Sequence, residues 1–267
     1  MRKLSFFAVT FAALLFASCG GNKSAQTAED VQADKTFEQE QIEANIKLNF
    51  DSLASEIVRL KQLPITQKDG MVVLTDEERQ VKPDYLLNPD VAENTTTLSE
   101  KYRVLSALQV DKEIASLYAM PTQDYDAEIT KLLAAINDPS FKVLDESEGV
   151  YEGSQDLYRA MDENGRINYF WQIVSTSLVE QMFIISRNTE KFLASFTDET
   201  ASNVSMRIAL IQDAINRLTV YDPELVPVAE AFDPLTVINA MTVDELKSQL
   251  NEAAPQIEEA RIALVME

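Results

Sequence analysis

The segment Ile167–Arg187, INYFWQIVSTSLVEQMFIISR, decides the fold class because its apolar residues recur at the period of a helix. One face of such a helix is apolar: Ile167, Phe170, Trp171, Val174, Leu178, Met182 and Ile185. The opposite face carries polar residues: Asn168, Gln172, Thr176, Glu180 and Arg187. Because Tyr169, Val179 and Phe183 also fall on that polar face, we expect neighbouring elements to cover part of it. The segment is therefore predicted to be the central helix of a bundle.

The chain that follows this segment continues with helical patterns. Apolar residues step by three and four along residues 198–218: Ala201, Val204, Ile208, Ile211, Ile215 and Leu218. This heptad spacing suits a seam within a bundle, and Asp198 is the predicted N-cap. Asp222 and Asp233 each precede a proline, which is typical of an N-cap followed by the first helical residue. Thr242, followed three residues later by a glutamate, indicates a capping box.

The preceding part of the chain also favours helices. Helical spacing predicts four of them: residues 37–63, 98–119, 125–136, and a short one from Ser154 to a stop at Asn164-Gly165. The low count of six glycines agrees, since sheet proteins with many tight turns need more. We therefore predict an all-α fold, an irregular multi-helix bundle of about 8–10 helices, with at most a short strand near residues 71–74.

The amino terminus has the order of an export signal. Two basic residues precede an apolar run, Leu4–Phe16, and the small residues Ala17-Ser18 lead to the only cysteine of the chain, Cys19. This apolar run is shorter than the ~20 residues that span a bilayer. A cleaved signal peptide is therefore predicted in preference to a permanent membrane helix.

The tetrapeptide Phe16-Ala17-Ser18-Cys19, followed by Gly20-Gly21, resembles the lipobox of Bacteroidota lipoproteins, although Phe16 stands where leucine is usual. The resemblance covers about twenty residues and implies that signal peptidase II cleaves before Cys19. Cys19 would then carry a diacylglyceryl group and further acyl chains such as palmitate, which anchor the protein to a membrane. This use of the thiol fits an exported chain whose single cysteine has no disulfide partner.

The residues directly behind Cys19 bear on the membrane that the protein reaches. Gly20 is not the aspartate that retains lipoproteins of some diderm bacteria in the inner membrane, and this favours the outer membrane. Surface export in Bacteroidota often uses an acidic cluster close behind the cysteine, whereas Asn22-Lys23-Ser24 occupies that place here. We expect a cell-envelope protein in the outer membrane that faces the periplasm.

Composition divides the chain into four parts. Residues 1–18 are the predicted signal peptide, and the small, polar and charged residues 19–35 are a predicted flexible tether. Residues 36–139 and 154–267 are the predicted N-terminal and C-terminal helical halves, joined by a polar, acidic stretch. We expect the two halves to pack together as one domain.

The chain is strongly acidic, with a net charge of −21 at pH 7. Loss of Arg2 and Lys3 with the signal peptide leaves 21 basic and 44 acidic residues, a net charge of −23. Such a surface repels phosphate backbones, so no nucleic-acid partner is expected. The absence of histidine excludes Ser-His-Asp and Cys-His catalysis and zinc sites built on imidazole. We predict no cofactor, no metal site and no catalytic residue.

Three features could carry chemistry, and each has a structural interpretation that we favour. Glu180 is the only acidic residue between Arg166 and Arg187, and a salt bridge or exposure to solvent explains it better than catalysis or cation binding. Trp171 is predicted to lie in the core, not in a ligand pocket. The run Asp162–Gly165 lacks the first and last ligands of a calcium loop, so we interpret it as a turn and helix cap.

These observations favour a lipid-anchored envelope protein that binds another envelope protein or has a structural role, without catalysis. One alternative is a lipoprotein that binds a small ligand or a cation between the two halves. Another is a carboxylate-dependent hydrolase of envelope polymers, since carboxylates are abundant. That activity would need two carboxylates that face each other across an open cleft.

Overall fold

The computed structural model describes residues 36–59, 74–144 and 154–266, and every regular element within these ranges is a helix. The all-α prediction is confirmed for these residues. The predicted strand near residues 71–74 falls mostly outside the described ranges, and Leu74 is not part of a strand. The predicted signal peptide, Cys19 and the tether also lie outside them.

The described residues contain eleven α-helices and four 3-10 helices. The α-helices are α1 Phe37–Arg59, α2 Asp76–Gln80, α3 Leu98–Leu117, α4 Gln123–Ile136, α5 Ser154–Glu163, α6 Ile167–Arg187, α7 Thr189–Phe192, α8 Asp198–Leu218, α9 Val226–Phe232, α10 Val243–Glu252 and α11 Ala254–Val265. The 3-10 helices are η1 Pro89–Asn94, η2 Pro139–Leu144, η3 Pro223–Leu225 and η4 Asp233–Val237. Because α2 and α7 have only five and four residues, the number of longer helices agrees with the prediction.

Several helix ends follow the capping chemistry of the sequence, and the start of α8 requires a correction. Helix α6 has the predicted bounds, and Gly165, with a φ of 67°, provides the left-handed stop after α5. Thr197, not Asp198, caps α8 and accepts the N–H of Thr200. The Asp198 carboxylate instead accepts the N–H of Val243 at 2.9 Å and so joins the start of α8 to the start of α10.

The two Asp-Pro pairs behave differently. Asp222 accepts a backbone N–H at 2.9 Å and caps η3 as predicted. Asp233 is the first residue of η4 and not its cap, and its carboxylate accepts a hydrogen bond from Gln212 of α8 at 3.1 Å. Thr242 accepts the N–H of Glu245 and caps α10, again as predicted.

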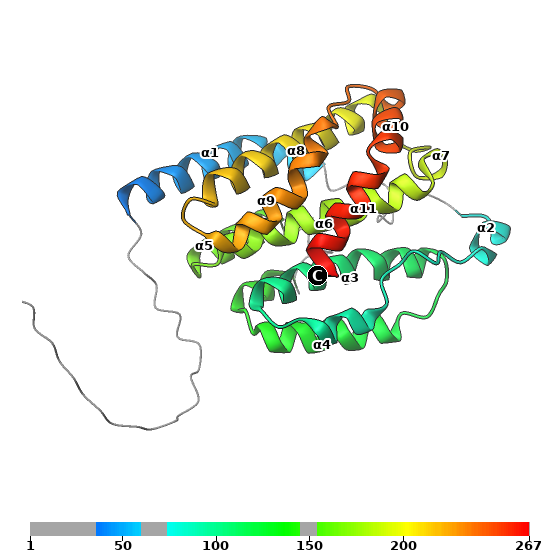
Figure 1. Ribbon diagram of the computed structural model, residues 1–267, viewed down its shortest axis with the longest axis horizontal. Coiled ribbons are helices and arrows are strands. Elements are labelled where there is room, and N and C mark those ends of the chain that lie inside the picture. Colours follow the sequence, from blue (N-terminus) through cyan, green and yellow to red (C-terminus); the bar gives the residue numbers. More distant parts are fainter. Residues whose placement is uncertain (1–35, 60–73, 145–153, 267) are drawn as a thin grey trace, which may run out of the picture. The chain divides into compact units, whose positions relative to one another are not determined.

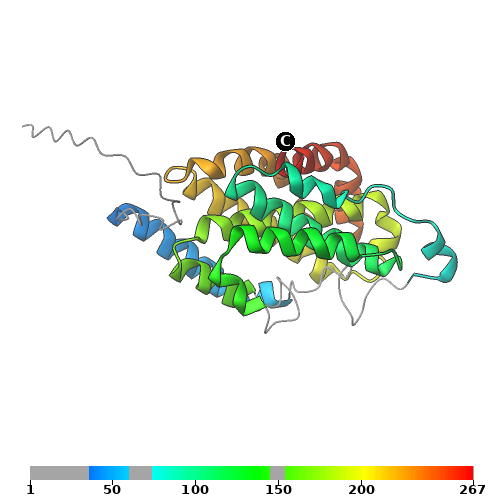
Figure 2. The same cartoon turned by 90° about the horizontal axis from the view of Figure 1, so that it is seen from below.

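Helix α6 is the centre of the bundle. It contacts α3, α5, α7, α8, α9, α10 and α11, while α1 packs on α8 and α4 packs on α3. In Figure 1, α4, α3 and α6 follow one another upward from the bottom of the view, and Figure 2 shows the same helices from the side of α4. All the described helices belong to one compact unit, Lys35–Glu267. Helix α3 of the first half therefore packs directly on α6 and α11 of the second.

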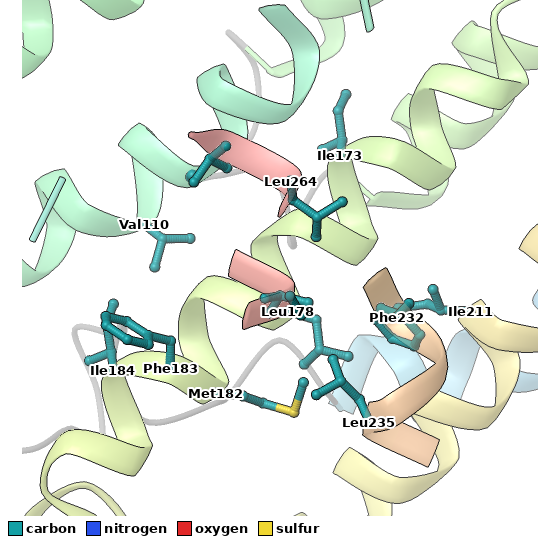
Figure 3. Packing of buried hydrophobic residues seen from close by; sticks show 14 of the residues in the cluster. Val110, Ile173, Leu178, Met182, Phe183, Ile184, Ile211, Phe232, Leu235 and Leu264 are labelled. Carbon is teal, nitrogen blue, oxygen red and sulfur yellow. The ribbon is translucent and has the colours of Figure 1, made fainter. Parts of the chain in front are cut away.

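The core gathers around the apolar face of α6. Trp171 is 1% exposed, and its ring meets that of Phe170 in a T-shaped contact at 5.2 Å. Figure 3 shows Leu178 and Met182 of α6 among side chains from α3, α8, α9, η4 and α11. Although α6 is so apolar, neither it nor any other described helix is long and apolar enough to cross a membrane.

Candidate functional site

The middle of the polar face of α6 is buried, although its side chains are hydrophilic. Gln172 is 0% exposed, and Thr176 and Glu180 are each 1% exposed. The sequence predicts either a salt bridge or exposure to solvent for Glu180, and the structure gives the salt bridge in a buried position. Because an unpaired buried polar group costs free energy, partners on neighbouring helices are needed. Gln172 and Glu180 have such partners, whereas the Thr176 hydroxyl has none within the described part of the chain.

Helix α3 supplies the matching polar line. Ser99, Arg103 and Asp111 are spaced by four and eight residues, which places them on one side of α3, and all three are buried. Since α3 and α6 pack directly, the two polar lines meet inside the bundle. We call this the polar seam, and its members are Ser99, Arg103 and Asp111 of α3, Gln172, Thr176 and Glu180 of α6, and Arg261 of α11.

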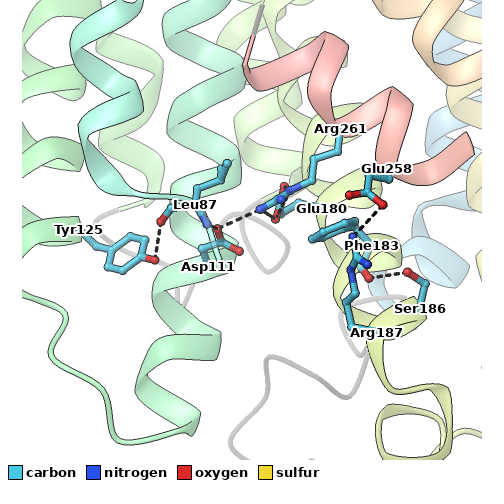
Figure 4. Close-up of polar contacts among 9 residues, drawn as sticks. All are labelled: Leu87, Asp111, Tyr125, Glu180, Phe183, Ser186, Arg187, Glu258 and Arg261. Carbon is cyan, nitrogen blue, oxygen red and sulfur yellow. Dashed lines mark hydrogen bonds and ion pairs between the residues drawn. The ribbon is translucent and has the colours of Figure 1, made fainter. Parts of the chain in front are cut away.

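One end of the polar seam is an ionic cluster of Asp111, Glu180 and Arg261 (Figure 4). Arg261 Nε donates to both carboxylate oxygens of Glu180 at 2.9 Å, and its Nη2 forms an ion pair with Glu180 Oε1 at 2.8 Å. The same Nη2 lies 3.6 Å from Asp111 Oδ2. The side chain of Glu180 is 1% exposed, that of Arg261 is 9% exposed and that of Asp111 is 0% exposed. Two carboxylates therefore share one guanidinium away from solvent.

The surroundings of Asp111 favour its protonated form. Burial and, second, the negative charge of Glu180 raise its pKa well above the usual range, while the Leu87 N–H and Arg261 act in the opposite direction. Asp111 Oδ1 has no hydrogen-bond partner within the described part of the chain. A proton on that carboxyl group can bridge to Glu180, as in other close carboxyl pairs. The cluster is then electrically neutral, with one carboxylate and one guanidinium.

The cluster also holds an irregular segment against α3 and α4. Asp111 Oδ2 accepts the backbone N–H of Leu87 at 2.6 Å, and the Tyr125 hydroxyl donates to the Leu87 carbonyl at 2.8 Å (Figure 4). Both backbone polar groups of Leu87 are thus bound to side chains, and Leu87 itself is buried. These bonds fix the connection between α2 and η1.

The ring of Phe183 contacts the cluster and a second, more exposed ion pair. The guanidinium carbons of Arg261 and Arg187 lie 4.0 and 4.2 Å from its centroid. Arg187 Nη2 pairs with Glu258 Oε2 of α11 at 3.0 Å (Figure 4). Because cation–π contacts strengthen when water is excluded, the ring helps to hold Arg261 in place.

The other end of the polar seam is a network around Arg103. Its Nε donates to the Leu264 carbonyl at 2.8 Å, and its Nη1 donates to Gln172 Oε1 at 3.0 Å. Gln172 Nε2 donates to Ser99 Oγ at 3.1 Å, and the Ser99 hydroxyl donates to the Glu224 carboxylate. Burial lowers the pKa of Arg103. The network ties α3, α6, η3 and α11 together.

Sequence reasoning found one member of the ionic cluster and missed two. Glu180 was singled out, whereas Asp111 and Arg261 were not. The available signal was a charge within an apolar stripe, since Arg261 lies four residues after Ile257 and three before Leu264. Such a charge needs a buried partner of opposite sign. Glu180 in the pattern of α6 and Arg261 in the pattern of α11 carry opposite charges, so the two patterns compared with each other would predict that they pair.

Among the described residues, no group of three or more acidic or cysteine side chains is placed to hold a metal ion. No protein-family model, curated protein or solved structure matches the chain.

What the polar seam can do chemically is hold a proton and fix the mutual register of α3, α6 and α11.

Proposed function

We propose that this chain is a lipid-anchored protein of the cell envelope, attached to the outer membrane through Cys19 and facing the periplasm. Its helical body binds another envelope protein or has a structural role, without catalysis. The observation that carries the proposal is the position of the only cysteine, directly behind a basic start, an apolar run and two small residues. Acyl chains on that thiol would give a stable anchor, because each buried methylene contributes about 0.8 kcal/mol.

The state of the buried carboxylates supports a non-catalytic role. Asp111 and Glu180 are the closest approach to an acid–base pair that the polar seam offers. A hydrolase of envelope polymers needs two carboxyl groups about 5–10 Å apart that substrate can reach. Here Arg261 occupies both oxygens of Glu180, and packed helices cover the pair. The pair therefore serves the packing of α3, α6 and α11.

The charge of the body supports a partner with a basic contact surface. The mature part carries a net charge of −23, and charge complementarity accelerates association and excludes like-charged partners. Association that depends on this complementarity weakens as salt screens the charges. Photo-crosslinking in intact cells should therefore capture a defined envelope protein, and the yield from washed envelopes should fall at high salt. Crosslinking to no defined protein would contradict a partner-binding role.

The lipid anchor is tested by intact mass of the native protein from the envelope fraction. We expect cleavage before Cys19 and added mass from a diacylglyceryl group and acyl chains. Cys19→Ala should stay uncleaved, and the matched control Ser24→Ala should be processed like the wild type. A bare Cys19 thiol or an intact amino terminus would refute the anchor.

A further inference from the structure

Helix α1, the first helix after the predicted tether, has an exposed face with large apolar residues. Phe37 is 74% exposed and Leu48 is 66% exposed. The two are eleven residues apart, which is three helical turns, so they lie on the same side of α1. Ile46, on the other side, is 2% exposed and belongs to the core. Helix α1 thus has an inner face packed on the body and an outer face open to solvent.

Between Gln41 and Asn49 the outer face of α1 exposes no charged side chain. From Gln41 to Asn49 the exposed side chains are Gln41, Ala44, Asn45, Leu48 and Asn49. Glu38 and Glu40, at the first turn, are the exposed charges among the side chains described for this helix. The charged residues of this stretch, Glu43 and Lys47, are only partly exposed. Depletion of charge beside exposed apolar groups is typical of a surface that becomes covered.

The end of α8 extends this apolar surface. Val220, which follows α8, is 75% exposed. Helices α1 and α8 pack side by side (Figure 1). In Figures 1 and 2 the start of α1 and the end of α8 lie at the same end of the bundle. Phe37 and Val220 therefore lie at the same end of the α1–α8 pair, and Leu48 lies three turns along α1 on the side of Phe37.

We propose that the apolar surface of Phe37, Leu48 and Val220 rests on the bilayer to which Cys19 is anchored. This inference rests on the proposed lipid anchor. Seventeen residues separate Cys19 from Phe37, and they can span at most about 60 Å. The anchor keeps the start of α1 within that distance of the lipid, so the surface meets the bilayer at a high effective concentration. Apolar side chains of a helix that lies in the interface insert between the lipid headgroups.

A bilayer suits this surface better than a second copy of the chain does. Two copies would bring together two bodies that each carry a net charge of −23 after cleavage. Neutral headgroups impose no such repulsion, and the exposed side chains from Gln41 to Asn49 carry no charge. Glu38 and Glu40 at the edge of the surface predict a preference for neutral over anionic lipid.

The test uses the mature chain, residues 19–267, with Cys19 coupled to a maleimide phospholipid in phosphatidylcholine vesicles. A Leu48→Trp variant reports lipid contact through quenching of its emission by brominated phosphatidylcholine. Val237→Trp is the matched control, because Val237 of η4 is 64% exposed against 66% for Leu48. The native Trp171 is 1% exposed and adds the same background to both variants. Equal melting temperatures verify that both variants fold.

We expect Leu48→Trp to lose emission in brominated vesicles and Val237→Trp to keep it. Adding Phe37→Glu and Val220→Glu to Leu48→Trp should abolish the loss, and so should vesicles rich in phosphatidylglycerol. Equal quenching of both variants, or none of Leu48→Trp, overturns the proposal. A Leu48→Trp emission that shifts with protein concentration in the absence of vesicles also overturns it, because a second copy then covers α1.

The lipid is attached chemically, so this measurement does not depend on acylation in the cell. A native protein with a bare Cys19 refutes the anchor, whatever the vesicles show. An acylated native protein whose Leu48→Trp variant is not quenched refutes only the docking of α1. The two failures are therefore distinguishable.

Discussion

Replacement of Arg261 by methionine tests how far the ionic cluster stabilises the bundle. The variant keeps an apolar stem but removes the contacts with Glu180 at 2.8–2.9 Å and the contact with the Phe183 ring. Glu180 is 1% exposed, so its charge would stay buried without a partner. Breaking such a pair costs about 3–5 kcal/mol. At about 2–4 °C for each kcal/mol in a unit of this size, the Tm should fall by roughly 6–20 °C.

Urea unfolding followed by circular dichroism measures the loss, and Arg187→Met is the matched control. Arg187 also contacts the Phe183 ring and an acidic residue of α11, but its side chain is 34% exposed. Its loss should stay below about 1 kcal/mol, because solvent screens the pair. The double variant Arg261→Met/Glu180→Gln should regain most of the stability, since no charge is left buried. A loss for Arg261→Met no larger than that for Arg187→Met would refute the reasoning.

The two carboxyl groups of the cluster should respond differently to amide substitution. Asp111→Asn keeps an acceptor for the Leu87 N–H and can donate an N–H towards Glu180, as the protonated acid does. We expect it to change the free energy of unfolding by less than about 1 kcal/mol. Glu180→Gln removes the partner that binds Arg261 Nε and Nη2 and leaves Asp111, 3.6 Å from Nη2, to pair with the guanidinium, so it should cost more, about 1.5–3 kcal/mol.

The same pair gives stability a pH dependence of defined sign. The folded-state pKa of Asp111 is raised, chiefly by burial and then by the charge of Glu180, so the folded state binds its proton more tightly than the unfolded chain does. The stabilisation is complete below the ordinary pKa of 3.8 and is lost as pH rises through the folded-state pKa. The slope reaches about 1.4 kcal/mol per pH unit. Identical slopes for wild type and Asp111→Asn would rule out a shared proton.

Three further predictions address other parts of the bundle. The amide oxygen and nitrogen of Gln181 are both buried without a hydrogen bond in the described structure, so Gln181→Met should raise the free energy of unfolding by about 1–2 kcal/mol. A lower free energy of unfolding in urea denaturation would show that the amide has a partner. Ala119 has a φ of 51° and Gly165 a φ of 67°, and both values lie in the left-handed region that favours glycine. Ala119→Gly should therefore stabilise the protein and Gly165→Ala should destabilise it, each by up to about 1 kcal/mol in thermal unfolding. A change of stability in the same direction for both variants would contradict this. Thr97 and Glu100 form a capping box at the start of α3, and backbone N–H groups, chiefly that of Thr97, lower the pKa of Glu100 to about 2. The box therefore contributes stability above pH 4.5 that is lost as pH falls towards 2. Glu100→Gln should flatten that acid limb, and an unchanged limb in acid titration would refute the assignment.

The helices were predictable because their signals are local. Helix α6 has the predicted bounds because apolar residues at helical spacing run from Ile167 to Ile185, two residues before its end. Capping residues at Asp222 and Thr242 act within three residues of themselves. The same locality explains the error at Asp198, where Thr197 offered a second capping side chain and the aspartate found a bond with α10.

The polar seam was less accessible because its bonds join distant residues. Arg103 and Gln172 are 69 residues apart, and Glu180 and Arg261 are 81 residues apart. The pattern of one helix shows which side chains are polar, but the partner that buries them lies on another helix. The sequence could therefore predict that Glu180 forms a salt bridge but not which residue is its partner, and it could predict no role for Asp111.

The choice of cation inside an acidic chain has a physical reason. The buried cations among the described residues are all arginines: Arg103, Arg207 and Arg261. A guanidinium keeps its charge when buried and spreads five donors over a rigid plane, whereas a buried ammonium readily loses its proton. Arg261 uses that plane to bind Glu180, approach Asp111 and lie against the Phe183 ring. One planar cation can therefore hold three helices in register at a point where two carboxyl groups meet, provided that one of them keeps its proton.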